Sequence, residues 1–184
     1  YNRFVKIKRK GPENMAQMIA YFSRAGNNYV NGQIKNLSIG NTEIAAKIIQ
    51  EQTKADLFKI DPIVPYSSDY SVCIEEARQD QMRGARPELK RYPEDLNAYD
   101  VIYLGYPNYW GTMPMAVFTF LEKFDFSGKT IRPFCTHEGS GMGSSKKDIS
   151  RLCPGAVVKN GLELHGARVT EAKAAIRKWL QSDT

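Results

Sequence analysis

Short apolar runs alternate with amphipathic helical segments along the chain from Met18 to its C-terminus. The apolar runs have strand length and are bounded by Gly, Pro, Asn or Asp. They are MIAYF (18–22), DLFKI (56–60), VIYLGY (101–106), TIRPFCT (130–136) and, as two candidates for one further strand, AVV (156–158) and LEL (162–164). A strand that is followed by a helix returns to the same sheet through a right-handed crossover. The alternation therefore predicts an α/β fold with a parallel sheet and helices on both of its faces.

Helical periodicity follows each predicted strand, and the helical segments begin near residues 41, 71, 114, 143 and 169. In the last segment, Thr170 is predicted to cap the helix, and the residues predicted to face the core are Ala172, Ala175, Ile176, Trp179 and Leu180. One strand carries an awkward residue, because Pro133 lacks the N–H group that a sheet ladder needs. Pro133 indicates a sheet edge or a bulge in the strand at 130–136.

The length and charge of the chain predict one domain with a basic tail. A chain of 184 residues is short enough for one hydrophobic core. Its formal net charge is +6, and residues 1–14 hold five basic residues and one acidic residue, which is +4 of that total. We expect residues 1–16 to lie outside the core and residues 17–184 to form the domain. We assign no function to the tail, and we expect no nucleic-acid or membrane partner.

The cysteines predict buried thiols. Cys73, Cys135 and Cys153 are odd in number and far apart, and no Cys-x-x-Cys pair suggests zinc or dithiol chemistry. We therefore expect free thiols and no metal site. No apolar run reaches the roughly 20 residues that a membrane helix needs, and no signal peptide is recognisable. These features predict a soluble protein of a reducing compartment, the cytoplasm.

The predicted topology places any ligand at one edge of the sheet. In a doubly wound parallel sheet, ligands bind outside the carboxyl ends of the strands, near the point where the strand order reverses. The loops at that edge are residues 23–42, 107–113 and 136–143.

The first loop predicts a phosphate site. It contains SRAGNN (23–28) and SIGNTE (38–43), and the second of these runs directly into a helical pattern. Free N–H groups and the positive end of the helix dipole favour a phosphate there, with the hydroxyls of Ser23 and Thr42 as further donors. The alternative is an ordinary helix start that Asn41 or Thr42 caps.

The second and third loops predict contacts to a planar ring. Tyr109 and Trp110 follow a buried strand and precede Gly111, so a flat heteroaromatic ring could stack there; the alternative is that Trp110 packs on a neighbouring helix. The third loop, THEGSGMG (136–143), is rich in glycine and carries His137 and Glu138. It lacks the residues of a Walker loop and of a nucleophile elbow, so we assign no catalytic residue.

Taken in order, these features resemble flavodoxin, specifically the branch of longer flavodoxin-like proteins. The likeness runs from about Met18 to the C-terminal helix, through YFSRAGNN, GNTE, DLFKI, YDVIYLGYPNYWGTMP, FLEKFDFSGKTIRPFCTHEGSG and LCPGA. The resemblance implies a doubly wound three-layer sandwich with a five-stranded parallel sheet of order 2-1-3-4-5, which holds one FMN noncovalently.

The resemblance also implies which residues hold the cofactor. The phosphate would be held by Ser23, Arg24, Asn41 and Thr42. One side and edge of the isoalloxazine would be held by Pro107, Asn108, Tyr109, Trp110 and Gly111, and its pyrimidine edge by Thr136, His137, Glu138, Gly139 and Gly141. The chain departs from the family pattern in two places. Residues 25–39 separate Ser23 from Gly40, and the third loop has no tyrosine or tryptophan, which predicts one open flavin face for a substrate or redox partner.

The resemblance favours an electron-transfer protein that works with a redox partner protein or a small electron acceptor. An alternative is an FMN oxidoreductase that takes hydride from NAD(P)H and reduces a quinone. A rival outside redox chemistry is a phospho-receiver domain, which needs acidic residues after the first and third strands. Those positions hold Ser23 and Arg24, and Pro107 and Asn108.

Overall fold

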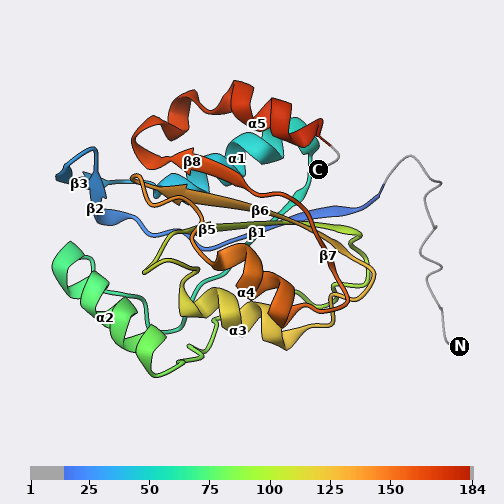
Figure 1. The fold of residues 1–184 in the computed structure, drawn as a ribbon, viewed down its shortest axis with the longest axis horizontal. Helices are drawn as coiled ribbons and strands as arrows, with labels where there is room; N and C mark the ends of the chain where they lie inside the picture. The colour runs from blue at the N-terminus through green and yellow to red at the C-terminus, as the bar shows by residue number, and fades with distance from the viewer. Residues whose placement is uncertain (1–14, 183–184) are drawn as a thin grey trace, which may run out of the picture.

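The computed structural model describes residues 15–182, which form three layers: a central sheet with helices on both faces (Figure 1). The strands are β1 (Gln17–Tyr21), β2 (Gly26–Val30), β3 (Gln33–Leu37), β4 (Asp56–Lys59), β5 (Val101–Pro107), β6 (Thr130–His137), β7 (Val157–Val158) and β8 (Leu162–His165). The helices are α1 (Asn41–Thr53), α2 (Tyr70–Met82), α3 (Met115–Lys123), α4 (Ser145–Leu152), the 3-10 helix η1 (Gly166–Glu171) and α5 (Lys173–Leu180). Helices α1 and α5 cover one face of the sheet, and α3 and α4 cover the other (Figure 1).

The central sheet is parallel and has the order β4-β1-β5-β6-β7, with β8 also paired to β6. The predicted fold class is therefore confirmed. The sheet has six strands rather than the predicted five, because two short strands, β7 and β8, share the fifth position beside β6. Strand β7 pairs with β6 at Thr130 and Ile131, whereas β8 pairs with it from Phe134 to His137. Both candidates for the last strand, AVV and LEL, are therefore strands.

The division of the fifth strand coincides with Pro133. The ladder between β6 and its outer neighbours is interrupted between Ile131 and Phe134, and Pro133 lies in this interval. A proline has no N–H group to donate to a neighbouring strand. The predicted sheet edge or bulge at Pro133 is wrong, because β6 is an inner strand whose register with β5 is unbroken from Thr130 to Thr136. The missing donor is accommodated where the outer neighbour changes from β7 to β8.

Residues 25–39, for which we predicted no strand, form an antiparallel hairpin from β2 and β3. The turn residues Asn31 and Gly32 both have positive φ, of 50° and 83°. Two successive positive φ values are typical of the tight turn that joins antiparallel strands, and Asn-Gly is its most common sequence. The hairpin lies at the end of the sheet to which the carboxyl ends of β1, β5 and β6 point (Figure 1).

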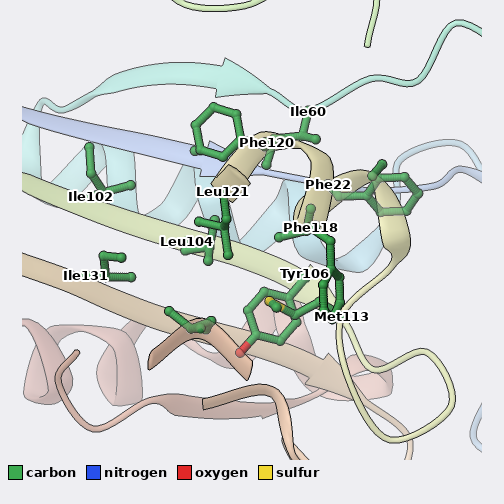
Figure 2. Packing of buried hydrophobic residues seen from close by; sticks show 14 of the residues in the cluster. Phe22, Ile60, Ile102, Leu104, Tyr106, Met113, Phe118, Phe120, Leu121 and Ile131 are labelled. Carbon is green, nitrogen blue, oxygen red and sulfur yellow. The ribbon is translucent and has the colours of Figure 1, made fainter. Parts of the chain in front are cut away.

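The sheet separates two clusters of buried side chains. On the side of α3 and α4, Ile102, Leu104 and Tyr106 of β5 pack with residues that include Phe120 and Leu121 (Figure 2). On the side of α1 and α5, the alternate β5 residues pack with residues that include Ile49, Ile176 and Trp179. A strand that is buried on both faces explains why VIYLGY is apolar without alternation.

Two predictions about the C-terminal segment are wrong. Thr170 does not cap an α-helix, because it lies inside η1 and α5 begins only at Lys173. Ala175 is exposed, whereas Ala172, Ile176 and Trp179 are buried in the core as predicted. A 3-10 helix has about 3.0 residues per turn instead of 3.6, so the side chains of η1 and α5 do not follow one α-helical periodicity across Ala172. The predicted tail lies almost wholly outside the described residues. Within residues 15–182, no helix combines the length and hydropathy that crossing a bilayer requires.

Candidate functional site

The three predicted loops meet at a cavity of about 440 Å³ at the carboxyl end of the sheet. From the first loop it is lined by Ser23, Arg24, Asn41 and Thr42, from the second by Pro107, Asn108, Tyr109, Trp110 and Gly111, and from the third by Thr136, His137 and Glu138. Gly139 and Gly141 do not line it, although Ser140 between them does. Ligand cavities in proteins commonly have volumes of about 300–1,000 Å³. The size and position are those of a small-molecule site.

One end of the cavity is formed by the N-terminus of α1, where the sequence predicted a phosphate site. The Oγ atom of Ser23 accepts a hydrogen bond of 3.0 Å from the backbone N of Glu43, and Ile44 N donates to Gly40 O. The first amides of a helix have no acceptor inside it, so Asn41 and Thr42 remain as donors toward the cavity. Neither Asn41 nor Thr42 is the cap; the cap hydroxyl comes from the distant Ser23.

Gly40 is required at this helix start. A Cβ atom there would clash with Ser23 Oγ and with the carbonyl oxygen of Arg24. The glycine thus lets the end of β1 approach the first turn of α1, which is the contact that Ser23 uses.

Arg24 lines the cavity, but its guanidinium is already hydrogen-bonded to the protein. Its Nε and Nη2 donate to Ser67 O at 2.9 and 2.7 Å, and Nη2 also donates to Ser68 O. Its Nη1 donates to Asn27 O and to the side-chain oxygen of Asn28. Arg24 therefore ties the start of the hairpin to the segment before α2.

A buried hydrogen bond joins the first and third loops. The hydroxyls of Thr42 and Thr136 are 2.7 Å apart, and both residues are buried. One hydroxyl donates to the other, so one of the two protons remains for a further acceptor. This contact sets the spacing between the α1 N-terminus and the end of β6.

Trp110 is held in a strained conformation at the cavity mouth. Its φ is +52°, which is uncommon for a bulky residue, and its side chain is 49% exposed. The indole Nε1 donates to Ile74 O of α2 at 2.8 Å, and the guanidinium carbon of Arg78 lies 5.7 Å from the ring centroid. Trp110 therefore contacts a neighbouring helix, as the second alternative for this residue predicted, and it also lines the cavity.

Tyr109 is packed inward, unlike the exposed Trp110 beside it. Its ring makes edge contacts with Phe22, at 6.0 Å between centroids, and a tilted contact with Tyr66. Its hydroxyl lies 3.8 Å from Cys73 Sγ. Burial raises the pKa of the Tyr109 phenol well above its ordinary value and also raises the pKa of the Cys73 thiol. Both groups are therefore neutral at pH 7.

Asn108 fixes the second loop against the third. Its Nδ2 donates to Gly141 O at 2.7 Å, and its Oδ1 accepts from Gly111 N at 3.0 Å. Gly141 thus supports the cavity without lining it. His137 Nδ1 accepts from Gly139 N at 2.9 Å, so a neutral ring carries its proton on Nε2.

Glu138 connects three segments that are far apart in the sequence. Its Oε2 accepts from Asn31 N at the hairpin turn, and its Oε1 accepts from Ala167 N in η1, both at 2.8 Å. His165 Nδ1 lies 3.7 Å from the same carboxylate. The hairpin tip is thereby attached to the third loop, which supports the hairpin beside the cavity.

Several cavity-lining residues escaped the sequence analysis. They are Asn28 and Tyr29 from the hairpin, Tyr70, Cys73, Ile74 and Ala77 from α2, and Gly166. The Asn-Gly pair at 31–32 is the signal that could have revealed the hairpin and so Tyr29. No sequence signal indicated that α2 lines the cavity. The helix itself was predicted, but the loop that precedes it was not among the loops that we assigned to the ligand edge.

The three cysteines are free and buried, as predicted. Within residues 15–182, no group of three histidine, cysteine or acidic side chains is arranged to hold a metal ion.

Comparison with protein families places most of the chain in one of them. A family model described as flavodoxin matches residues 17–183. A comparison with curated proteins gives no match.

Solved structures share the fold. A protein from Bacteroides eggerthii DSM 20697 that is proposed to be a flavoprotein is 30% identical, with a TM-score of 0.73, 91% of this chain covered and 96% of that chain. A similar protein from Bacteroides uniformis ATCC 8492 is 26% identical, with a TM-score of 0.69 and coverage of 92% and 100%. A flavoprotein from Lactobacillus acidophilus NCFM, solved in complex with FMN, is 19% identical, with a TM-score of 0.59 and coverage of 91% and 100%. The last likeness concerns the fold alone.

Proposed function

The chain belongs to the flavodoxin family, and we propose that it binds one FMN noncovalently and uses it to transfer electrons. The observation that carries the proposal is the convergence of three loops on one cavity, with helix amides at one end and aromatic side chains at the other. The Lactobacillus acidophilus flavoprotein, which has the same fold, was solved with FMN.

The α1 end of the cavity fits a phosphate group. The amides of Asn41 and Thr42 supply donors, and the helix dipole adds positive potential. Because Ser23 Oγ accepts from Glu43 N, its own proton is free to be donated to a phosphate oxygen. The Thr42 and Thr136 pair has one further proton to donate. No lysine lines the described part of the cavity, and this site does not require one.

The opposite end fits a planar ring. Trp110 offers an exposed indole whose position is fixed by its bond to Ile74 O. His137, with its proton on Nε2, supplies a donor to a ring edge, and the positive φ of Gly139 shapes the turn of the third loop that follows it. A bound ring would remove the Trp110 side chain from water, which accounts for a tryptophan at the end of a buried strand.

When bound, FMN supplies one- and two-electron chemistry, and the chain sets its affinity and reduction potential. The ionised groups that line the cavity are few. The Arg24 guanidinium donates to main-chain carbonyl oxygens, and the Glu138 side chain, which accepts from backbone amides, adds no positive charge. Burial raises the pKa values of Tyr70 and Tyr109, which keeps both phenols neutral. A lining of neutral donors with no uncommitted cation disfavours the negative charge of the reduced flavin, so we infer a low potential.

Stepwise reduction of the purified protein after incubation with FMN tests the proposal. We expect one FMN per chain, with a visible absorbance that falls as reductant is added. A protein that stays colourless and cannot be reconstituted with FMN contradicts the proposal. The spectrum also reports whether a one-electron state accumulates.

We propose that the electrons reach the flavin from a separate reductase rather than directly from NAD(P)H. Arg24 is the one arginine or lysine among the described residues lining the cavity, and its N–H groups are already engaged. A nicotinamide dinucleotide carries a pyrophosphate that such a lining does not neutralise. Steady NADPH oxidation by the purified FMN-loaded protein and a quinone, without added reductase, would reverse this assignment.

A further inference from the structure

The loop that carries Trp110 closes in a two-residue turn between Tyr109 and Thr112. Tyr109 N donates to Thr112 O at 2.8 Å, and Thr112 N donates to Tyr109 O at 3.2 Å, so these two residues form an antiparallel bridge. The residues between them, Trp110 and Gly111, both have positive φ, of 52° and 82°. Two successive positive φ values are ordinary for Asn-Gly or Gly-Gly but not for a tryptophan. Contacts from outside the turn must therefore keep Trp110 in this conformation.

Helix α4 provides such contacts through the side chain of Asp148. The Thr112 hydroxyl donates to Asp148 Oδ2 at 2.7 Å, and the Ser144 hydroxyl donates to the same oxygen at 3.0 Å. Ser144 N donates in turn to Gly111 O at 2.8 Å. One carboxylate oxygen thus connects Thr112, at the base of the turn, with Ser144, which binds the tip of the turn.

The start of α4 is itself fixed close to the turn. A Cβ atom on Gly143 would clash with Gly111 O, so a glycine is needed for this approach. The Tyr106 hydroxyl lies 2.8 Å from Ser145 Oγ, and both residues are fully buried. This bond ties the first residue of α4 to β5, the strand that leads into the turn. Asp148 is therefore carried on a helix whose position relative to the turn is already set.

Asp148 reaches the cavity through the turn and not by direct contact. Asp148 and Thr112 do not line the cavity, whereas Trp110 and Gly111 do. Thr112 is buried, so removal of the carboxylate would leave its hydroxyl without a protein acceptor. The base of the turn would then lose its connection to α4.

Contacts from α2 hold Trp110 but not the base of the turn. Gln81 Nε2 donates to Trp110 O at 3.1 Å, and the indole Nε1 donates to Ile74 O at 2.8 Å. Without the Asp148 contact, the backbone at residues 110–111 can relax toward the negative φ that a bulky residue prefers. Such a change would turn the indole relative to the cavity.

We propose that Asp148 is a positioning residue of the FMN site, which holds the turn at residues 109–112 in the conformation that directs the Trp110 indole toward the bound flavin ring. The inference rests on the proposed function. The effect of Asp148 on FMN is carried by the indole, so a protein that lacks the indole should no longer respond to changes at Asp148.

A double-mutant cycle on FMN binding tests the proposal, with the Kd measured by flavin fluorescence. Asp148→Ala removes the acceptor, and Thr112→Val removes the donor while it keeps the shape of the side chain. Each should raise the FMN Kd about fivefold in the wild-type background and less than about twofold in the Trp110→Ala background. Asp148→Asn, which keeps one oxygen acceptor, should restore most of the affinity.

Two variants of α4 serve as controls. Lys147→Ala changes an exposed residue outside the cavity lining, and Arg151→Ala removes only the exposed ion pair to Asp148 Oδ1. Both should leave the FMN Kd unchanged.

The outcomes separate the positioning role from the proposed function. An unchanged FMN Kd in folded Asp148→Ala and Thr112→Val overturns the positioning role. Equal weakening in the two backgrounds also overturns it, because the carboxylate would then act without the indole. Should Asp148→Ala not fold, Thr112→Val decides; if neither folds, the carboxylate serves the fold and the proposal fails. A wild-type protein that binds no FMN instead contradicts the proposed function.

Discussion

At the scale of single residues, several side chains that were predicted to bind the cofactor form hydrogen bonds with distant parts of the protein. Arg24 binds main-chain carbonyls, Glu138 binds the amides of Asn31 and Ala167, and Thr42 bonds to Thr136. Each of these side chains brings together segments that are distant in sequence. Their effect on a ligand is therefore largely through positioning, and substitutions that preserve charge or polarity distinguish positioning from direct binding.

Replacement of Trp110 by alanine should weaken FMN binding. Trp110 is half-exposed at the cavity mouth, and an aromatic pair contributes about 0.5–1.5 kcal/mol beyond the area that it buries. We expect the FMN Kd to rise about tenfold in a fluorescence titration. Trp110→Phe, which keeps a ring but loses the bond to Ile74 O, should lose less affinity. An unchanged Kd in the alanine variant would place the indole away from the flavin.

Replacement of Arg24 by lysine should destabilise the protein although the charge is kept. A lysine cannot reproduce the forked contacts to Ser67 O and Ser68 O, and a hydrogen bond to a charged group contributes about 1.5–3 kcal/mol. We expect the free energy of unfolding in urea to fall by about 1–3 kcal/mol. The exposed Arg168→Lys substitution is the control and should change little. If Arg24→Lys kept full stability and lost only FMN affinity, Arg24 would be a phosphate ligand.

At the scale of elements, the β2–β3 hairpin and α2 shape the site as much as the loops do. Both elements lie at the carboxyl end of the sheet (Figure 1). Arg24 joins them, because it donates to Asn27 O at the start of the hairpin and to Ser67 O in the segment before α2. The hairpin has few supports of its own, because β2 and β3 pair only with each other within the described chain. Its order therefore depends on tertiary contacts at its two ends.

Replacement of Glu138 by glutamine should loosen the hairpin. The carboxylate accepts from Asn31 N and Ala167 N with one oxygen each, and a glutamine retains a single oxygen acceptor. We expect amide hydrogen exchange in residues 26–37 to speed up about tenfold, since hydrogen bonds to a charged group contribute about 1.5–3 kcal/mol. Glu75→Gln, on the exposed face of α2, serves as the control. Equal exchange rates in wild type and Glu138→Gln would show that the turn does not depend on this contact.

At the scale of the whole molecule, tyrosines and thiols are the dominant ionisable groups of the interior. Burial raises the pKa of Tyr66, Tyr103 and Tyr106, and it raises the pKa of Cys135 in the core. The pKa of Tyr99 is raised from 10.0 to about 12 by burial and by its hydrogen bond to Asp56. The folded state thus favours the protonated form of each group.

This arrangement predicts an alkaline limit to stability. A group whose folded pKa is raised contributes stability that is complete below its unfolded pKa and is lost as the pH rises through the folded value. For Tyr99 the loss falls between pH 10.0 and about pH 12. Urea unfolding under reducing conditions should give a constant free energy up to about pH 8 and a falling one above about pH 9, where the thiols of the unfolded chain begin to ionise. The Tyr99→Phe variant should fall less steeply, and stability that rises from pH 9 to pH 11 would contradict the prediction.

The sequence by itself determined the α/β class, the strand positions of the central sheet and the loops at the ligand edge. Apolar periodicity is a local property, and the carboxyl ends of parallel strands must meet at one edge whatever the details of packing. For the same reason, residues such as Ser23, Trp110 and Thr136 could be assigned to one site before their contacts were known.

Only the tertiary structure decided what those residues touch and what else reaches the cavity. The Arg24 and Glu138 contacts each join segments tens of residues apart, and the placement of Tyr29 beside Tyr70 depends on how the hairpin and α2 pack. The 3-10 turn that displaces Thr170 and exposes Ala175 likewise depends on how the chain leaves β8 and returns to the sheet. Packing between distant segments carries no periodic signal in the chain, because its energy exists only once those segments have met.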